Sequence, residues 1–171
     1  YVKQRTILRA GLESIAEPYD YVLIDCPPNL YLVTQNALAA SDYYVVTALP
    51  DHLSTIGLSI LEERVNDNNK KLNYAAGIAE GDVGTPELGG IIFVRVRLGG
   101  SVITNVHDRK MREISGRYSG KTFQHYTTEG IGYSEAAESA LPVFLLSGTN
   151  PKRVADQYRE ITAEFIERIP L

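Results

Sequence analysis

The sequence has 171 residues, of which 44% are hydrophobic and 22% are charged. This composition is typical of a globular protein with enough chain to bury a core. The single cysteine, Cys26, excludes an internal disulfide framework and a zinc site built from cysteines. No apolar stretch approaches the roughly 20 residues of a membrane span, and the first residues lack a signal-peptide pattern. We therefore expect a cytoplasmic protein without membrane attachment.

The net charge of −4 is unevenly distributed along the chain. Residues 95–121 carry seven basic and two acidic side chains, whereas the other 144 residues carry 10 basic and 19 acidic ones. Positive charge gathered in one segment indicates a surface for an anionic partner, although a solvated helix face can have the same composition.

The N-terminal quarter of the sequence predicts a helix, a buried strand and a second helix. Apolar residues at helical spacing predict a helix over 2–16. Residues 21–25 are a nearly continuous apolar run that ends in Asp25, the pattern of a buried parallel strand. The two prolines at 27 and 28 end this strand, and a helix follows over 30–40. Because the sequence starts with Tyr1 and enters a helical pattern at once, we expect it to be the C-terminal part of a longer protein.

The remainder alternates strands with longer helices. An N-cap at Asp51 or Ser54 and Asn150-Pro151 at the start of the last helix give two helix beginnings. The predicted elements are strands at 43–49, 90–96 and 122–126, helices from 51 to about 69, at 101–118 and from 150 onward, a loop with a short helix at 129–140, and a surface loop or insertion at 73–88.

This alternation predicts a single α/β domain over residues 1–171, with a parallel sheet and helices on both of its faces. Four strands are few for such a sheet, so we expect its N-terminal part to be missing from these residues. In open parallel sheets, ligands bind beyond the carboxyl ends of the strands. Asp25 is therefore placed to hold a hydrated magnesium ion beside nucleotide phosphates. The alternative role is an aspartate that caps a turn or the next helix.

The segment from Tyr19 to Ala40 contains D-C-P-P at 25–28 and T-Q-N-A-L at 34–38. At this spacing, the segment resembles the switch II region of the ParA/Soj branch of the ParA–MinD ATPases. Shorter matches to the same family extend the resemblance over essentially the whole chain: A-A-S-D at 39–42, T-I-G-L at 55–58, S-E-A at 134–136 and N-P-K at 150–152.

The resemblance implies a P-loop NTPase-like three-layer sandwich and an ATPase that partitions plasmid or chromosomal DNA. It implies ATP and Mg²⁺ as cofactors, with Asp25 as the Walker B-type carboxylate that holds magnesium through water. Pro27, Pro28 and Asn29 would form the switch that senses the γ-phosphate. The residues implied in adenine binding are Arg95, Thr127 and Thr128, although the family often has proline at the position of Thr128.

The family's N-terminal K-G-G-x-G-K-T loop does not occur in this sequence. The nearest imitation, Gly116 to Thr122, has three residues between its glycines where a P-loop needs four, and it ends a helix instead of opening one. Without a lysine and amide cradle, the charge that develops on the γ-phosphate is not stabilised. We therefore expect the 171 residues alone to be catalytically inactive.

The family also binds DNA nonspecifically, as an ATP-bound homodimer that a ParB-like activator releases, and it associates with the nucleoid. In this chain, the basic side chains assigned to DNA are Arg97, Arg109, Lys110, Arg112 and Lys121. Where the family shows P-R-N-V-R, residues 128–132 read T-E-G-I-G, so both family arginines are absent. The alternatives are a MinD-like ATPase that positions another cargo, and a non-enzymatic α/β binding module. The acidic last helix disfavours membrane cycling.

Overall fold

The structure is a computed structural model that describes residues 2–13, 15, 19–78 and 84–171. These residues divide into two compact units, which are described separately. The first unit comprises residues 1–44, 59–88 and 171, and the second comprises residues 45–58 and 89–170. Both the paired strands β1 and β2 and the long helix α4 pass from one unit into the other.

The first unit begins with two short helices, α1 (Val2–Arg5) and α2 (Ile7–Leu12), and not with the continuous helix predicted over 2–16. The break lies at Thr6, which has φ −119° and ψ 11°. Its hydroxyl donates a hydrogen bond to the carbonyl oxygen of Val2 at 3.2 Å. Threonine side chains that bond to nearby backbone compete with the helix in this way. Residues 14 and 16 lie outside the described residues.

Helix α3 (Leu32–Ala39) follows the predicted boundaries within two residues and carries the T-Q-N-A-L motif. The Asn36 side-chain amide donates to the carbonyl of Gln4 at 2.8 Å, and the Nε of Arg5 donates to the Gln35 side chain at 2.6 Å. Two polar residues of the motif therefore fasten α3 to the preceding short helices. Behind them, Ala39 packs with Leu72 and Ala76 of α4 in a buried cluster.

Helix α4 (His52–Ile78) is 27 residues long and extends nine residues beyond its predicted end. Asp51 caps it as predicted, because its carboxylate accepts the backbone N–H of Ser54 at 2.7 Å. The buried positions Val65, Leu72 and Ala76 continue a helical stripe into the Gly/Ala-rich segment. The loop predicted over 73–88 is therefore wrong at 73–78, which are helical, and at 87–88, which begin a strand; residues 79–83 lie outside the described residues.

The buried strand predicted over 21–25 is also wrong. These residues have no strand assignment, and Leu23 and Val22 are 80% and 44% exposed. A parallel strand that is apolar on both faces needs a hydrogen-bonded neighbour and covering helices. An apolar run identifies a segment able to form such a strand, but the pairing partner decides whether it does.

The sheet contains β1 (Tyr43–Ala48) and β2 (Glu87–Phe93) side by side. The two strands run parallel: the backbone N–H of Glu87 donates to the carbonyl of Asp42 at 2.9 Å, and that of Val94 to the carbonyl of Ala48 at 3.0 Å. On the other side of β2, the segment predicted as a strand over 122–126 has no assigned strand, and two isolated parallel bridges lie at its start and just beyond its end. They join Ile91 to Thr122 and Val96 to Thr128.

In the second unit, a hairpin of β3 (Leu98–Gly99) and β4 (Val102–Ile103) precedes α5 (Asn105–Arg117). The helix predicted to begin at residue 101 therefore begins four residues later. Leu98 pairs with Ile103, and Gly99 pairs with Val102. The two-residue turn between them needs a positive φ, which Gly100 supplies at +69°.

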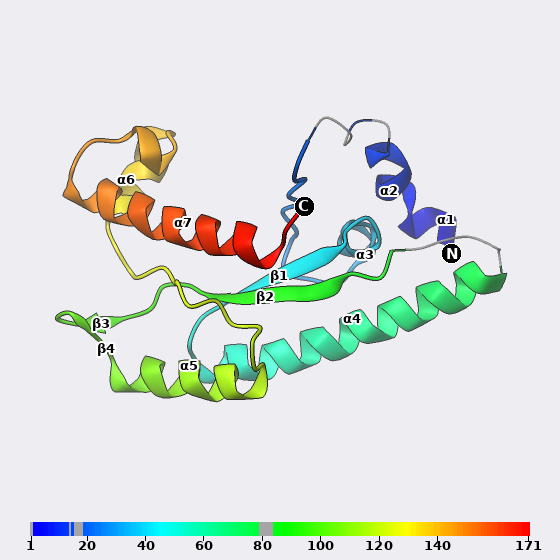
Figure 1. Cartoon of the computed structure of the whole chain (residues 1–171), viewed down its shortest axis with the longest axis horizontal. Helices are drawn as coiled ribbons and strands as arrows, with labels where there is room; N and C mark the ends of the chain where they lie inside the picture. The colour runs from blue at the N-terminus through cyan, green and yellow to red at the C-terminus, as the bar shows by residue number, and fades with distance from the viewer. Residues whose placement is uncertain (1, 14, 16–18, 79–83) are drawn as a thin grey trace. The chain divides into compact units, whose positions relative to one another are not determined.

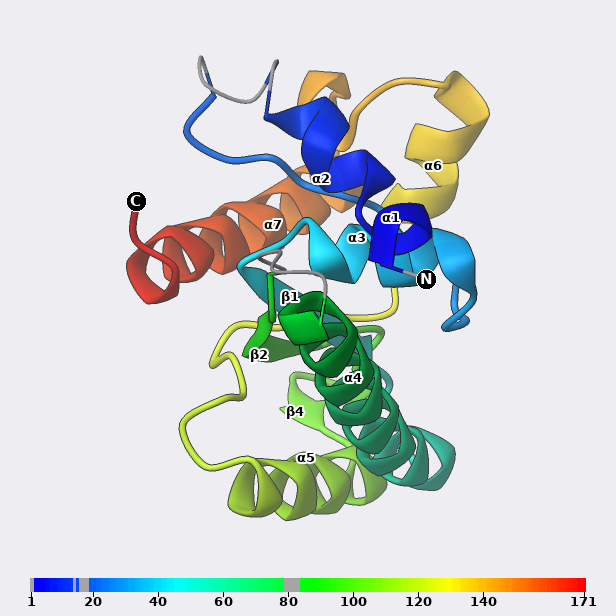
Figure 2. The same ribbon diagram turned by 90° about the vertical axis from the view of Figure 1, so that its right-hand side faces the viewer.

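Helices α6 (Gly132–Ser139), η1 (Val143–Leu145) and α7 (Thr149–Arg168) complete the second unit. Helix α7 lies on one face of the sheet and α5 on the other, as both views show (Figure 1, Figure 2). The predicted parallel sheet with helices on both faces is confirmed. The core between these layers consists of fully or almost fully buried residues: Ile91, Phe93, Val96, Ile114, Phe123 and Val154.

The predicted cap of the last helix is shifted by two residues. Gly148, with φ +119°, is the N-cap, and Asn150 and Pro151 lie inside the first turn. Proline is tolerated there because the first amides of a helix have no partner within the helix. Among the described residues, no helix is both long enough and apolar enough to cross a membrane.

Candidate functional site

The switch segment lies in the first unit, ahead of α3. Asp25, Pro27 and Pro28 are exposed. The backbone N–H of Asn29 donates to the carbonyl of Pro27 at 2.7 Å, and its side-chain oxygen accepts the N–H of Tyr31 at 3.1 Å. This Asx turn connects the stiff Pro-Pro segment directly to the start of α3. The four candidate residues therefore form one short exposed turn, with the Asp25 carboxylate at its N-terminal end.

Asp25 provides a single exposed carboxylate. Among the described residues, no group of three or more His, Cys, Asp or Glu side chains is arranged to hold a metal ion. Magnesium at nucleotide sites is held by one or two carboxylates, with water and phosphate oxygens as its other ligands. Asp25 fits that limited role. Desolvation, followed by the charge on Asp25, raises the pKa of the Cys26 thiol, so Cys26 is not an activated nucleophile.

The three residues assigned to adenine come together in the second unit, where β2 ends. The backbone N–H of Arg95 donates to the hydroxyl of Thr127 at 3.2 Å. Thr127 and Thr128 are each only 5% exposed. The guanidinium of Arg95 remains in solvent, with 66% of the side chain exposed. Arg95 also adopts φ +54°, which is uncommon for a residue with a side chain and is enriched at functional sites.

Gln157 of α7 holds Thr128 of this site in place. The sequence did not predict this role. The side-chain amide of Gln157 donates to the hydroxyl of Thr128 at 2.9 Å, and its side-chain oxygen accepts the backbone N–H of Thr128 at 3.1 Å. Both polar groups of Thr128 are therefore engaged by the protein. A ligand at this edge would contact the exposed guanidinium of Arg95 and backbone atoms more readily than the threonine hydroxyls.

The basic residues assigned to DNA do not form one continuous surface. Arg109 and Arg112 are exposed on α5, and Arg112 pairs with Asp108 at 2.8 Å. Lys110 shares a stripe at four-residue spacing with the buried residues Ile114 and Tyr118. Its side chain is only 16% exposed and binds Glu113 at 2.7 Å, and this hydrogen bond lowers the pKa of Glu113.

Lys121 and Arg97 lie on different segments beside β2. The carbonyl of Lys121 accepts the backbone N–H of Ile91, two residues before the C-terminal end of the strand, whereas Arg97 lies four residues beyond that end. Arg95 and Arg97 are close to each other, and both are near the same acid. Glu129 lies 3.2 Å from Arg97 and 3.6 Å from Arg95.

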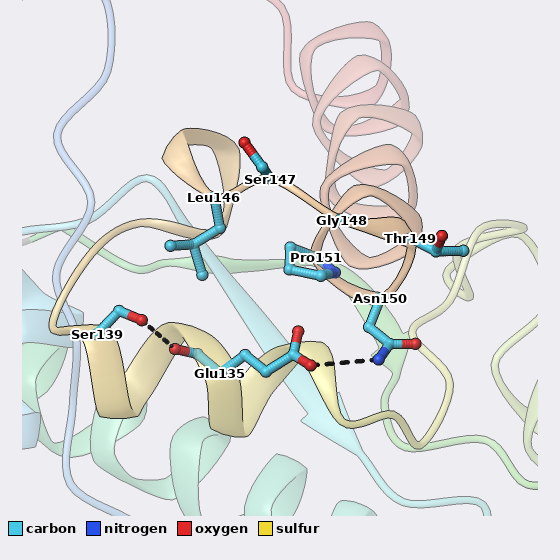
Figure 3. Close-up of a pocket in the computed structure, with 8 residues that line it drawn as sticks. All are labelled: Glu135, Ser139, Leu146, Ser147, Gly148, Thr149, Asn150 and Pro151. Carbon is cyan, nitrogen blue, oxygen red and sulfur yellow. Dashed lines mark hydrogen bonds between the residues drawn. The ribbon is translucent and has the colours of Figure 1, made fainter.

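The S-E-A and N-P-K motifs meet in a hollow of about 400 Å³ in the second unit (Figure 3). Glu135 points toward Asn150, whose side-chain amide donates to it at 3.2 Å (Figure 3). At Gly132, an added Cβ would lie 2.6 Å from the carbonyl oxygen of Asn150. These motif residues therefore join the start of α6 to the start of α7.

The parallel sheet between helical layers is that of an α/β fold of the P-loop NTPase kind. A solved structure of Cyanothece McdA in complex with ATP matches this fold with a TM-score of 0.71. The match covers 96% of this chain and 57% of that chain, at 16% sequence identity.

The sequence comparisons show which proteins this chain is similar to. The family model described as "AAA domain" matches residues 1–78. The sporulation initiation inhibitor protein Soj of Bacillus subtilis is 30% identical over 163 residues, which cover 95% of this chain and 58% of Soj. The chromosome partitioning protein ParA of Myxococcus xanthus is 27% identical over 144 residues, covering 81% and 44%. The chain is a homologue of the Soj and ParA partitioning proteins, and it spans about half the length of these relatives.

Proposed function

We propose that this chain is part of a ParA-type ATPase that uses ATP binding and hydrolysis to partition plasmid or chromosomal DNA. The observation that carries the proposal is the similarity to Soj over 95% of the chain. Within that span, Asp25-Cys26-Pro27-Pro28 and the T-Q-N-A-L helix keep the order and spacing of the switch II region.

In this proposal, Asp25 holds a magnesium ion through water. Its exposure and its position before a stiff turn suit an ion that keeps most of its waters and phosphate ligands. The ion would neutralise charge that develops on the γ-phosphate. Pro27 and Pro28 limit the conformations of the turn, and Asn29 ties the turn to α3. A change at the phosphate would therefore be transmitted to the helix that carries the T-Q-N-A-L motif.

Adenine binding is proposed for the edge where Arg95 meets Thr127 and Thr128. The exposed guanidinium of Arg95 is planar and can stack on a purine ring. The backbone of residues 127–128 is held by β2 on one side and by Gln157 on the other. A rigid edge of this kind lowers the entropy lost when a ligand binds.

Nonspecific DNA binding is proposed for the exposed cations of the second unit. Arg109 and Arg112 of α5 form the centre of this surface, and Arg97 precedes them in the sequence. Arginine binds phosphate oxygens through charge-assisted, often bidentate, hydrogen bonds. The expected partners of the whole protein are a second copy in an ATP-bound homodimer and a ParB-like activator, with a nucleoid-associated location.

DNA binding is tested by anisotropy of a fluorescent 30-base-pair duplex with the protein as its gene encodes it, in the presence of ATP and 50 mM salt. The variant carries Arg109→Glu and Arg112→Glu. The matched control carries Lys70→Glu and Lys71→Glu, two exposed lysines of α4. We expect the first variant to bind about tenfold more weakly, or more, and to lose about two units of salt dependence. Equal binding by both variants, or no binding by the wild type, contradicts the proposed DNA surface.

A MinD-like ATPase that positions another cargo is the second candidate. It is favoured by the acids that accompany the basic residues, since Glu129, Glu113 and Asp108 pair with four of them. A wild-type chain that binds no duplex DNA at low salt would support this candidate over DNA partitioning.

A further inference from the structure

Glu129 occupies a position between two arginines that the sequence assigned to different ligands. Its Oε1 atom accepts a hydrogen bond from the Nε of Arg97 at 3.2 Å and lies 3.6 Å from Nη2 of Arg95. Arg95 and Arg97 are two residues apart, and both side chains reach the same carboxylate although the backbone at Arg95 is left-handed, with φ +54°. One carboxylate therefore serves two guanidinium groups.

The backbone holds this arrangement in place. The N–H of Glu129 donates to the carbonyl of Val96 at 3.2 Å, and Val96 and Thr128 form a parallel bridge. The N–H of Arg97 donates to Nδ1 of His107 on α5 at 3.0 Å. Both partners of the contact thus emerge from hydrogen-bonded backbone, and the carboxylate is kept beside the arginines by the fold.

This contact contributes little to the stability of the fold. The side chains of Arg95, Arg97 and Glu129 are 66%, 64% and 39% exposed. Exposed ion pairs contribute about 0–1 kcal/mol and are screened by salt. The same exposure makes the guanidinium groups reachable by phosphate, which competes with the carboxylate for the same N–H donors. The larger effect of Glu129 is therefore on ligand binding.

We propose that Glu129 sets the strength of DNA binding by occupying Arg95 and Arg97, so that backbone phosphates must displace it before they reach these arginines. This inference rests on the proposed DNA-binding function. The acid directly follows Thr128, which is fixed by Gln157. The position of the carboxylate is consequently linked to the edge proposed for adenine, and a ligand that moves residues 127–128 would change how firmly Glu129 holds the two arginines.

The test is Glu129→Gln in the protein as its gene encodes it, with ATP present and duplex DNA anisotropy measured at four salt concentrations from 50 to 200 mM. Glu138→Gln is the matched control, because it removes the same charge from an exposed residue of α6. We expect E129Q to bind about three- to tenfold more tightly at 50 mM salt and to steepen the salt slope by about one to two, one unit for each phosphate newly contacted. E138Q should change the affinity less than twofold.

A second pair of variants tests whether the gain in DNA affinity from E129Q acts through Arg97 or only through the change in net charge. In an Arg97→Gln background, E129Q should gain less than half of the affinity that it gains in the wild type, since one of its two arginines is gone. A thermal melt of E129Q that coincides with that of the wild type confirms an intact fold. Equal gains from E129Q and E138Q, an equal gain with and without Arg97, or an unchanged affinity overturn the inference.

Failure of this inference is distinguishable from failure of the proposed DNA surface. Suppose that the wild type binds DNA, that the double variant Arg109→Glu, Arg112→Glu binds it more weakly, and that E129Q binds as the wild type does. In that case only the proposed role of Glu129 is refuted. If neither the wild type nor E129Q binds duplex DNA at 50 mM salt, both are wrong.

Discussion

The carboxylate of Glu164 on α7 accepts the backbone N–H of Gln124 through both oxygens, at 2.8 and 3.0 Å. It also accepts the backbone N–H of His125 at 2.9 Å and the Nε of Arg168 at 2.7 Å. Glu164 is 8% exposed. A buried side chain thus accepts two backbone amides of a segment in which the amides of Phe123 and Thr127 donate to carbonyls of β2.

Other side chains of α7 extend this attachment. The guanidinium of Arg168 donates to the carbonyls of Gly120 at 3.0 Å and Thr122 at 2.8 Å, and it lies 4.8 Å from the centre of the Phe123 ring. Gln157 binds Thr128 at the other end of the segment. Buried backbone groups need partners, and here one helix supplies them along the free side of the segment that leads to the proposed adenine edge.

Replacing Glu164 should therefore destabilise the second unit. We expect Glu164→Gln to lower the free energy of unfolding by about 2–4 kcal/mol, because it weakens charge-assisted hydrogen bonds and leaves Arg168 without its acid. Urea unfolding measures the loss. Glu160→Gln, an exposed position one turn earlier, should change stability by less than about 0.5 kcal/mol. Equal stability of the two variants would refute the role assigned to Glu164.

The same carboxylate predicts a pH dependence. Burial alone would raise the pKa of Glu164, but hydrogen bonds from the backbone of His125 and Gln124, from the His125 ring and from Arg168 outweigh burial and lower it below its usual 4.5. A lowered folded pKa adds stability that is fully present above the unfolded pKa and is lost as pH falls through the folded value. The stability difference between the wild type and E164Q should thus be constant from pH 7 to about 5 and shrink below about 4.5. A difference that grows on acidification contradicts this assignment.

The close contact between α6 and α7 predicts that replacing Gly132 lowers the stability of the fold. Gly132→Ala would place a methyl group 2.6 Å from the carbonyl oxygen of Asn150, so we expect a loss of about 1–3 kcal/mol in the free energy of unfolding. Gly116→Ala is the matched change in α5, where nothing lies within 4 Å. There we expect a gain of about 0.5–1 kcal/mol from the higher helix propensity of alanine. Chemical denaturation of both variants checks the opposite signs.

Residues 1–171 alone should not hydrolyse ATP. They contain no K-G-G-x-G-K-T loop to cradle the phosphates, and the G-K-T at 120–122 follows a helix instead of opening one. Phosphoryl transfer depends on that positioning and charge stabilisation. Phosphate release by the purified chain should equal the buffer background. Turnover that Asp25→Asn abolishes would contradict the prediction.

Much of the fold could be predicted from local signals. The alternation of apolar strands with helices predicted the parallel sheet and its two helical layers, and Asp51 was identified as a cap. The failures lie where long-range pairing decides the outcome. The apolar run 21–25 has the pattern of a buried strand, yet Leu23 is 80% exposed. Likewise, the segment near Gln124 makes isolated bridges instead of a full ladder, and a carboxylate 40 residues away in sequence accepts the Gln124 amide.

The candidate site shows the same division. Sequence motifs brought Arg95, Thr127 and Thr128 into one proposal, and the structure places them in contact. Gln157 and Glu129 were missed because each acts through a partner about 30 residues distant in sequence. For Glu129 a signal was present: an acid stands where the related family has arginine, eight residues after the end of the basic segment 95–121.

The most direct test of the ATPase assignment is ATP hydrolysis by the protein as its gene encodes it, comparing Asp25→Asn with Asp20→Asn. Both changes remove one exposed carboxylate from the same segment. If Asp25 holds the magnesium ion, D25N should lower ATP turnover by about 100-fold or more while D20N remains near the wild-type rate. Equal turnover by the two variants, or a wild type that neither binds nor hydrolyses ATP, would contradict the account.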